Sequence, residues 1–187
     1  IESTDGERTV DLKQGVIFFS YFENIFSPHL TAKVQISNTG TTIEGEDGVM
    51  TSVYNGLPLV GGERVIIKIS GNSPTNKGLD FSDSPEKYFY VSSISNILID
   101  AEREAFTLNL VSREALTNET TRVGRKYSSS QKISDSVQDI LKKYIRTEKE
   151  LSISETANPY GFIGNLKKPF TIITWLASKS VSSKKDS

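Results

Sequence analysis

Cysteine is absent from the chain, and histidine occurs once, at position 29. Without cysteine there is no thiol nucleophile, no disulfide and no thiolate metal site. A single histidine excludes a metal site built from several histidines, and any Ser-His-Asp unit would have to use His29. His29 follows Pro28 at an expected bend between two strands, so we interpret it as a turn residue rather than a general base.

The chain also has little net charge and no long apolar run. Its 22 Lys and Arg residues nearly cancel its 23 Asp and Glu residues, which leaves a formal charge of −1 over 187 residues. This balance gives no strong attraction to nucleic acid or to an anionic membrane. No run approaches the roughly 18 apolar residues of a transmembrane helix, and no signal-peptide pattern is present. These features fit a protein that folds in the bacterial cytoplasm, and a first residue other than Met predicts that the natural start is missing.

The first 112 residues have mainly the pattern of β-strands. Ala32, Val34 and Ile36 alternate with polar neighbours, which is the period of a strand with one buried face. Gly61 and Gly62 favour a tight turn with positive φ. Strands are expected at residues 16–22, 31–37, 65–69, 88–99 and 105–111, and a long surface loop at 70–87. The first two and the last two strands should pair antiparallel, which is typical of a small barrel or sandwich.

Helical patterns begin after the strands. Ser112 is a candidate N-cap for a short helix that starts at residue 113. Apolar residues recur with helical spacing from residue 133 to 144, and Ser134 is the expected N-cap of that helix. Pro169 predicts the first residue of a final helix, in which Trp175 should lie in the core. A Ser-rich hinge is expected at residues 127–131 and a short strand at 151–154.

Candidate sites for chemistry are few, and each has a structural interpretation that we favour. The acidic cluster at residues 44–48 lacks the ligand spacing and the distal Glu of a calcium loop, so it predicts a solvated turn. Residues 61–64, Gly-Gly-Glu-Arg, lack the lysine and hydroxyl of a phosphate loop. The pairs at 142–143 and 167–168, both Lys-Lys, are more typical of solvated helix ends, and Asn118 heads a glycosylation-like triplet that we interpret as coincidence. We therefore predict no catalytic, cofactor-binding or metal-binding residues.

Three groups of segments, taken in order, resemble one known family. They are YFENIFSPHL at 21–30; LPLVGGERV at 57–65 with YFYV at 88–91 and LNLVSREA at 108–115; and ISDSV at 133–137 with FIGN at 162–165 and KPFTIITWLASK at 168–179. The chain resembles the central baseplate hub proteins of contractile-tailed bacteriophages over most of residues 16–181, and more distantly the spike trimers of type VI secretion.

The resemblance implies a fold and a role. The fold class would be α+β, with an antiparallel β-barrel-like tube domain at residues 1–112 and the start of a second, mixed α/β domain at 113–187 that is incomplete in this chain. The protein would be a non-enzymatic homotrimer in the virion's tail baseplate, assembled in the host cytoplasm. It would join the six-fold tail tube to the three-fold spike and line the channel, with tube, spike and other baseplate proteins as partners and no cofactor.

Other roles remain open from the sequence. The chain could be another tail-tube, spike or type VI-like structural protein, a peptidoglycan hydrolase module, or a generic binding module. The loops at residues 38–48 and 70–87 are candidate contact surfaces, although either could equally be idle surface.

Overall fold

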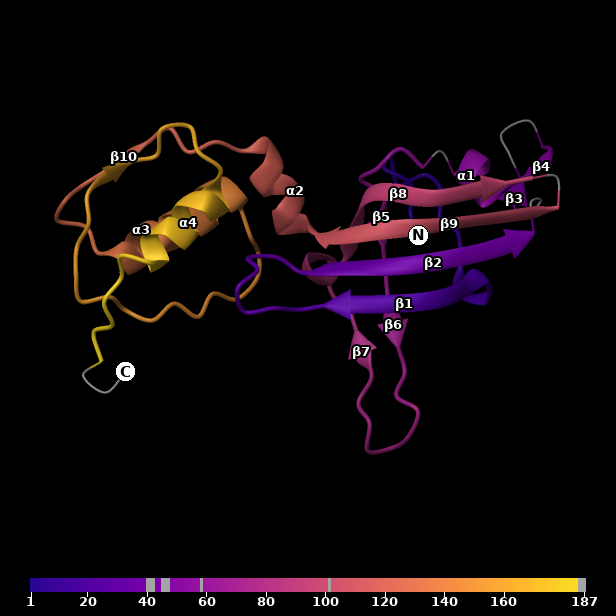
Figure 1. The fold of residues 1–187 in the computed structure, drawn as a ribbon, viewed down its shortest axis with the longest axis horizontal. Helices are drawn as coiled ribbons and strands as arrows, with labels where there is room; N and C mark the ends of the chain where they lie inside the picture. Colours follow the sequence, from indigo (N-terminus) through magenta and orange to yellow (C-terminus); the bar gives the residue numbers. More distant parts are fainter. Residues whose placement is uncertain (40–42, 45–47, 58, 101, 185–187) are drawn as a thin grey trace. The chain divides into compact units, whose positions relative to one another are not determined.

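A computed structural model describes residues 1–39, 43–44, 48–57, 59–100 and 102–184 of the chain (Figure 1). The chain divides into two compact units, Ile1–Arg113 and Glu114–Ser187, and each is described by itself. Their assignment as a first tube domain and the start of a second domain stays a prediction. Among the described residues, no helix has both the length and the apolar character needed to cross a bilayer.

The first unit is built on a five-stranded sheet in the order β1-β2-β9-β8-β5. Its strands are β1 Val16–Phe22, β2 Thr31–Thr39, β9 Arg103–Ser112, β8 Phe89–Ile99 and β5 Arg64–Val65. Every neighbouring pair is antiparallel, which confirms the two pairings predicted from the sequence. The sheet is open, because β1 and β5 lie at opposite ends of the order. The α+β class is confirmed, and the sheet of the first unit is curled like half of a barrel.

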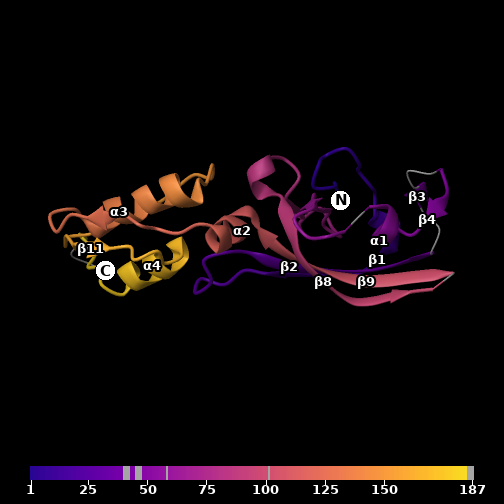
Figure 2. The ribbon, with the colours of Figure 1, turned by 90° about the horizontal axis from the view of Figure 1, so that it is seen from above.

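One face of this sheet is buried. The alternating residues Ala32, Val34 and Ile36 all point into the core, as predicted. They meet Phe89, Val91, Phe106, Leu108 and Leu110 from the neighbouring strands and Val53, Leu57, Leu59 and Val65 from the covering segments. Figure 2 shows the N-terminal segment and the short helix α1, Val53–Gly56, on one side of the strands. Among the described residues of this unit, no such layer covers the opposite face (Figure 2).

Smaller elements decorate the sheet and correct two expectations. They are η1 Lys13–Gly15, β3 Ile43–Glu44, β4 Met50–Thr51, β6 Lys68–Ile69, β7 Leu79–Asp80 and η2 Pro85–Lys87. The single strand predicted at 65–69 is wrong, because β5 pairs with β8 whereas β6 leaves the sheet and pairs with β7. The predicted 70–87 loop is therefore the tip and return of a projecting hairpin (Figure 1).

The second unit packs two helices against a small two-stranded sheet. Its elements are α2 Arg113–Thr120, β10 Lys126–Tyr127, α3 Ile133–Ile140, the π-helical η3 Leu141–Ile145, β11 Phe162–Ile163 and α4 Pro169–Ala177. The core contains Val123, Tyr127, Ile133, Ile140, Ile172 and Leu176. The helix starts expected at residues 113 and 169 are confirmed. The predicted hinge at 127–131 is wrong at its first residue, because Tyr127 is buried and stacks on Phe162 at a centroid distance of 4.5 Å.

Both helices α3 and α4 lack an N-cap side chain of their own. Lys132 and Lys168 occupy the two N-cap positions, and neither makes a side-chain capping bond. The predicted cap Ser134 is wrong, because it lies inside α3 and its N–H donates to Thr156 Oγ1 at 3.1 Å. Thr156 thus caps α3 from a segment 22 residues away. The strand predicted just before it, at residues 151–154, is wrong, because these residues form no strand.

Candidate functional site

The candidate catalytic and metal-binding residues do not converge. Within the described ranges, no group of three His, Cys, Asp or Glu side chains is close enough to hold a metal ion. His29 lies in the bend between β1 and β2, as predicted, and Ser27 Oγ donates to its carbonyl at 2.9 Å. Of the acidic cluster at 44–48, Glu44 lies in β3 and Gly48 has a φ of 75°, whereas residues 45–47 fall outside the described residues.

The Gly-Gly-Glu-Arg segment forms the predicted turn, and backbone N–H groups of this turn already donate to the Glu63 carboxylate. Gly61 and Gly62 have φ values of 102° and 97°, a region that favours glycine. The fully buried Glu63 carboxylate accepts from Val60 N at 2.6 Å and from Gly61 N at 2.9 Å. Arg64 pairs with Glu2 at 2.7 Å. The N–H groups that a phosphate would need are therefore already bonded to a carboxylate of the chain.

A second buried glutamate holds the covering layer on the sheet. Glu104 of β9 is fully buried, and its two carboxylate oxygens accept from Val53 N at 2.9 Å and from Tyr54 N at 3.2 Å. These donors are the first N–H groups of α1, which a helix of this length cannot satisfy internally. Glu104 joins two segments that are about 50 residues apart in the sequence, whereas Glu63 holds the turn in which it lies. The sequence pattern did not predict either role.

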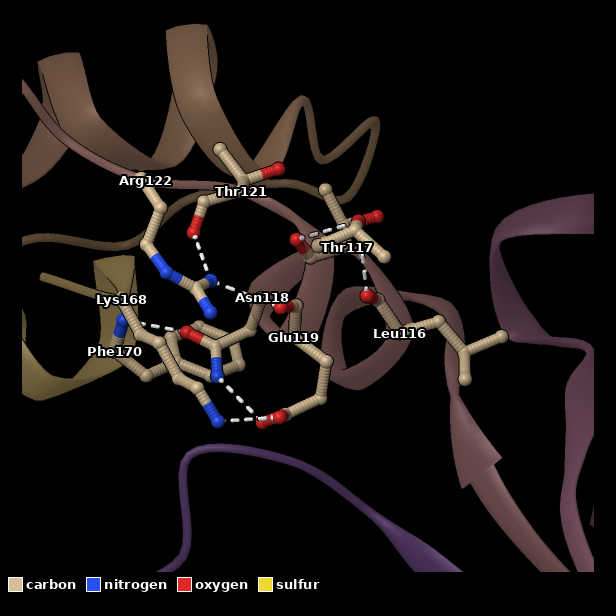
Figure 3. A network of polar contacts seen from close by, with 9 residues as sticks. Leu116, Thr117, Asn118, Glu119, Thr121, Arg122, Lys168 and Phe170 are labelled. Atoms are coloured by element: carbon tan, nitrogen blue, oxygen red, sulfur yellow. Dashed lines mark hydrogen bonds and ion pairs between the residues drawn. The ribbon is translucent and has the colours of Figure 1, made fainter. Parts of the chain in front are cut away.

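The polar network around Asn118 is structural as well. Asn118 is buried, and its Oδ1 accepts from Phe170 N at 2.8 Å, so it caps α4 across the unit (Figure 3). Its amide donates to Glu119 Oε1 at 3.3 Å, and Glu119 pairs with Lys168. A buried capping amide is not available as a sugar acceptor, which agrees with the interpretation of the triplet as coincidence.

Of the remaining basic and aromatic candidates, Lys143 and Trp175 have structural partners. Lys143 pairs with Asp139 at 2.6 Å, and the Tyr127 hydroxyl donates to the same carboxylate at 2.9 Å. Burial raises the pKa of the Asp139 carboxyl, but its bonds to Lys143 and Tyr127 outweigh burial, and the pKa lies below its ordinary value. Trp175 is 40% exposed and meets Phe162 edge-on at 5.8 Å, so its predicted place in the core is only half right.

The open face of the first unit's sheet is polar at its centre, where Lys33 lies beside Asn109. Asn109 lies at its centre, and its amide donates to Ser93 Oγ at 3.2 Å and Ser95 Oγ at 3.1 Å. Asn96 donates to Thr107 Oγ1 at 3.3 Å along the same face. Hydroxyl and amide groups that bond to one another across strands form a hydrated surface with little affinity for a charged polymer.

Two edges of this sheet carry its exposed apolar side chains. On β1, the edge strand, Ile17, Phe18 and Phe22 are exposed. On β8, β5 and the turn before it bond to residues 89–91, and further along the strand Ile97, Leu98 and Ile99 are exposed. Exposed apolar groups along an unpaired strand edge are typical of a surface that another chain covers.

The turn between β1 and β2 adds an apolar tip. Ile25 and Phe26 are 94% and 93% exposed. The turn is ordered by hydrogen bonds, with Asn24 Oδ1 accepting from Phe26 N and Asn24 O accepting from Ser27 N, both at 2.9 Å. The tip and the two edges form the candidate assembly surface of this unit.

Comparison with known proteins gives one structural relative. No protein-family model matches the chain, and no curated protein sequence matches it. A solved structure of an E. coli component of the type VI secretion system is similar with a TM-score of 0.47 and 10% identity, over 87% of this chain. That component is described as structurally similar to the tail proteins gp27 and gp5 of bacteriophage T4. The chain spans 43% of the length of that component.

Proposed function

We propose that the chain is a structural subunit of a phage tail baseplate, part of the central hub that joins the six-fold tail tube to the three-fold spike. One observation carries the proposal: the antiparallel sheet has one dry face, one open face with a polar centre, and two apolar edges, β1 and residues 92–99 of β8, that pair with no further strand among the described residues. Such a sheet is suited to packing beside other copies in a closed shell, with its polar face toward water. The sequence resemblance to hub proteins supports the same role.

The assembly that we propose is a homotrimer in the virion. A hub must present three-fold symmetry to the spike and six similar surfaces to the tube, so each subunit has to supply two related surfaces. Interfaces of this kind are built from broad, shape-complementary contact rather than from a pocket. The open face around Asn109 would then line the channel, where neutral hydroxyl and amide groups surround the single charge of Lys33, so that DNA passes without strong retention.

The test is the oligomeric state of the full-length protein. Light scattering combined with size exclusion is expected to give the mass of a trimer. A hexamer would favour a tail-tube protein instead, and a monomer at every concentration would overturn the proposal. Cryo-electron microscopy of assembled tails gives the independent check, because the chain should be traced at the junction of tube and spike.

A non-enzymatic role is part of the same proposal. Its support is that the buried carboxylates Glu63 and Glu104 are bonded to backbone N–H groups rather than placed beside a reacting group. A peptidoglycan-clearing assay with the purified protein is expected to show no activity. Clearing that a single Asp or Glu substitution abolished would contradict this role.

A further inference from the structure

The first unit's sheet has two free edges that differ in sequence but match in character. The outer edge of β1 has no neighbour in the described sheet, and neither has β8 beyond the residues that pair with β5 and its flanking turn. Each such edge presents unpaired backbone N–H and C=O groups, which are a template for another strand.

Neither edge carries the residues that usually block strand pairing. Natural edge strands are protected by charged side chains, especially Lys, or by Pro. β1 has the sequence VIFFSYF, and the free part of β8, residues 92–99, has the sequence SSISNILI. Neither contains a charged residue or a proline. Bulges interrupt β1 after Val16 and β8 after Val91 and Ser95, so the edges are bent but not closed to a partner.

The two edges have opposite strand directions, and their residues can be aligned through the register of the sheet. Since β1, β2, β9 and β8 alternate in direction, β1 of a second copy placed beside β8 would continue the antiparallel order. Ser20 of β1 pairs with Lys33, Lys33 with Asn109, and Asn109 with Ser93, so Ser20 and Ser93 lie on one line across the sheet. The apolar part of each edge lies toward the same end of the sheet, around Val16–Phe18 and Ile97–Ile99.

We propose that the first unit's sheet joins a second copy of itself head to tail, with the β1 edge of one copy pairing antiparallel with the β8 edge of the next. This inference rests on the proposed function and specifies the interface through which it assembles. Head-to-tail pairing covers both edges of every copy when the ring closes. A two-fold pairing of β1 with β1 would leave the β8 edge, with Ile97, Leu98 and Ile99, in water.

The absence of cysteine makes this interface testable by disulfide trapping. In the double variant Ser20→Cys/Ser93→Cys, the two thiols of one chain are separated by three strand spacings of about 4.8 Å, or roughly 14 Å. A disulfide needs Cα atoms about 4.4 to 6.8 Å apart, so any disulfide formed must join two chains. Mild oxidation is expected to give a ladder of covalent oligomers, whose largest member has the mass of the closed ring.

Matched variants separate this pairing from other contacts. Ser20→Cys/Ser95→Cys tests a stagger of two residues on the same face, and a product from either pair supports the interface. The pair Ser20→Cys/Ser73→Cys, with Ser73 in the exposed β6–β7 hairpin, reports random collision and is expected to react at least tenfold more slowly.

Each of the other outcomes overturns the inference. Rapid cross-linking of Ser20→Cys alone would show two-fold β1 pairing, and cross-linking no faster than the Ser73 control would show that the edges do not meet. If the full-length protein is a trimer but neither edge pair reacts, the edge pairing is wrong and the proposed function stands. If the protein is monomeric throughout, the proposed function itself fails.

Discussion

Replacing Glu104 by glutamine should destabilise the first unit more than the same change at Glu63. Both side chains are fully buried. All hydrogen bonds to their carboxylates among the described residues come from backbone N–H groups. The substitution keeps the shape and removes one acceptor atom. At Glu104 each carboxylate oxygen accepts from a different N–H group, whereas at Glu63 one oxygen accepts from both N–H groups.

The geometry sets the size of the difference. At Glu104 the two oxygens serve different donors, Val53 N and Tyr54 N, so in Glu104→Gln an amide NH2 must face a backbone N–H. A buried donor without an acceptor costs about 1–3 kcal/mol. At Glu63, Oε1 accepts from both Val60 N and Gly61 N, and Oε2 only shares the Gly61 donor at 3.1 Å, so a glutamine oxygen can keep a bond to each donor. Glu63→Gln still buries an amide NH2, but it leaves no backbone N–H without an acceptor, so it should cost less than Glu104→Gln.

Urea unfolding followed by far-UV circular dichroism measures the two free energies of unfolding. Hydrogen exchange adds a local check, because the Val53 and Tyr54 amides should lose protection in Glu104→Gln and keep it in Glu63→Gln. Equal stability of the two variants, with unchanged exchange at both amides, would show that Glu104 does not anchor α1 as described.

The remaining predictions concern the second unit. Asn118→Ala removes the cap of α4 and should cost about 1 kcal/mol, measured by the unfolding midpoint in Trp fluorescence, whereas Asn118→Asp keeps an acceptor and should cost less. Thr156→Val removes the oxygen that accepts from Ser134 N and should cost about 1 kcal/mol, with Thr156→Ser as the matched control. If Asn118→Ala and Asn118→Asp, or Thr156→Val and Thr156→Ser, lose the same stability, the capping role of that residue is contradicted. Burial raises the pKa of Glu114, but the bond and charge of Lys149, a backbone hydrogen bond and the bond from Thr147 together outweigh burial, and the pKa lies below its ordinary value. The stability that wild type holds over Glu114→Gln should therefore be full near pH 7 and fall as pH drops through the lowered pKa, as read from urea midpoints; a gap that does not change between pH 7 and pH 3 would refute this.

Alternation and turn chemistry made much of the first unit predictable. β2 shows a strict two-residue period, and its buried residues are the ones that the period selects. The Gly61–Gly62 turn was predictable because few residues other than glycine adopt such φ values. The 65–69 run was wrongly predicted as one strand, because a short run rich in Val and Ile does not show where the chain leaves one partner strand for another.

The helix caps of the second unit could not be predicted from local patterns. A cap is normally sought in the residue before the helix, and there the sequence has Lys132 and Lys168. The groups that bond to the helix starts come from Thr156, 22 residues from its partner, and Asn118, 52 residues from its partner. Only the tertiary packing brings these polar groups to the helix starts.

The sequence of β1 carries a signal of the assembly surface. β1 breaks the alternation of a half-buried strand, because Phe18 and Phe22 lie on the face where β2 carries Lys33 and Gln35. A strand that is apolar on both faces in an otherwise alternating sheet indicates that its outward side is covered by something. Which strands form the edges depends on the strand order, and the sequence does not contain that order in any local pattern.

The anchors and the edges should respond independently, because they act on different surfaces of one sheet. Glu104 ties α1 to the dry face, so Glu104→Gln weakens the fold while leaving β1 and the free part of β8 unchanged. Ser20 and Ser93 lie on the open face, where serine-to-cysteine changes bury nothing new. At a temperature where Glu104→Gln is still folded, its disulfide trapping through positions 20 and 93 should therefore proceed at the unmodified rate. A loss of trapping in the folded variant would mean that the covering layer also shapes the edges, and the two surfaces would have to be treated as one.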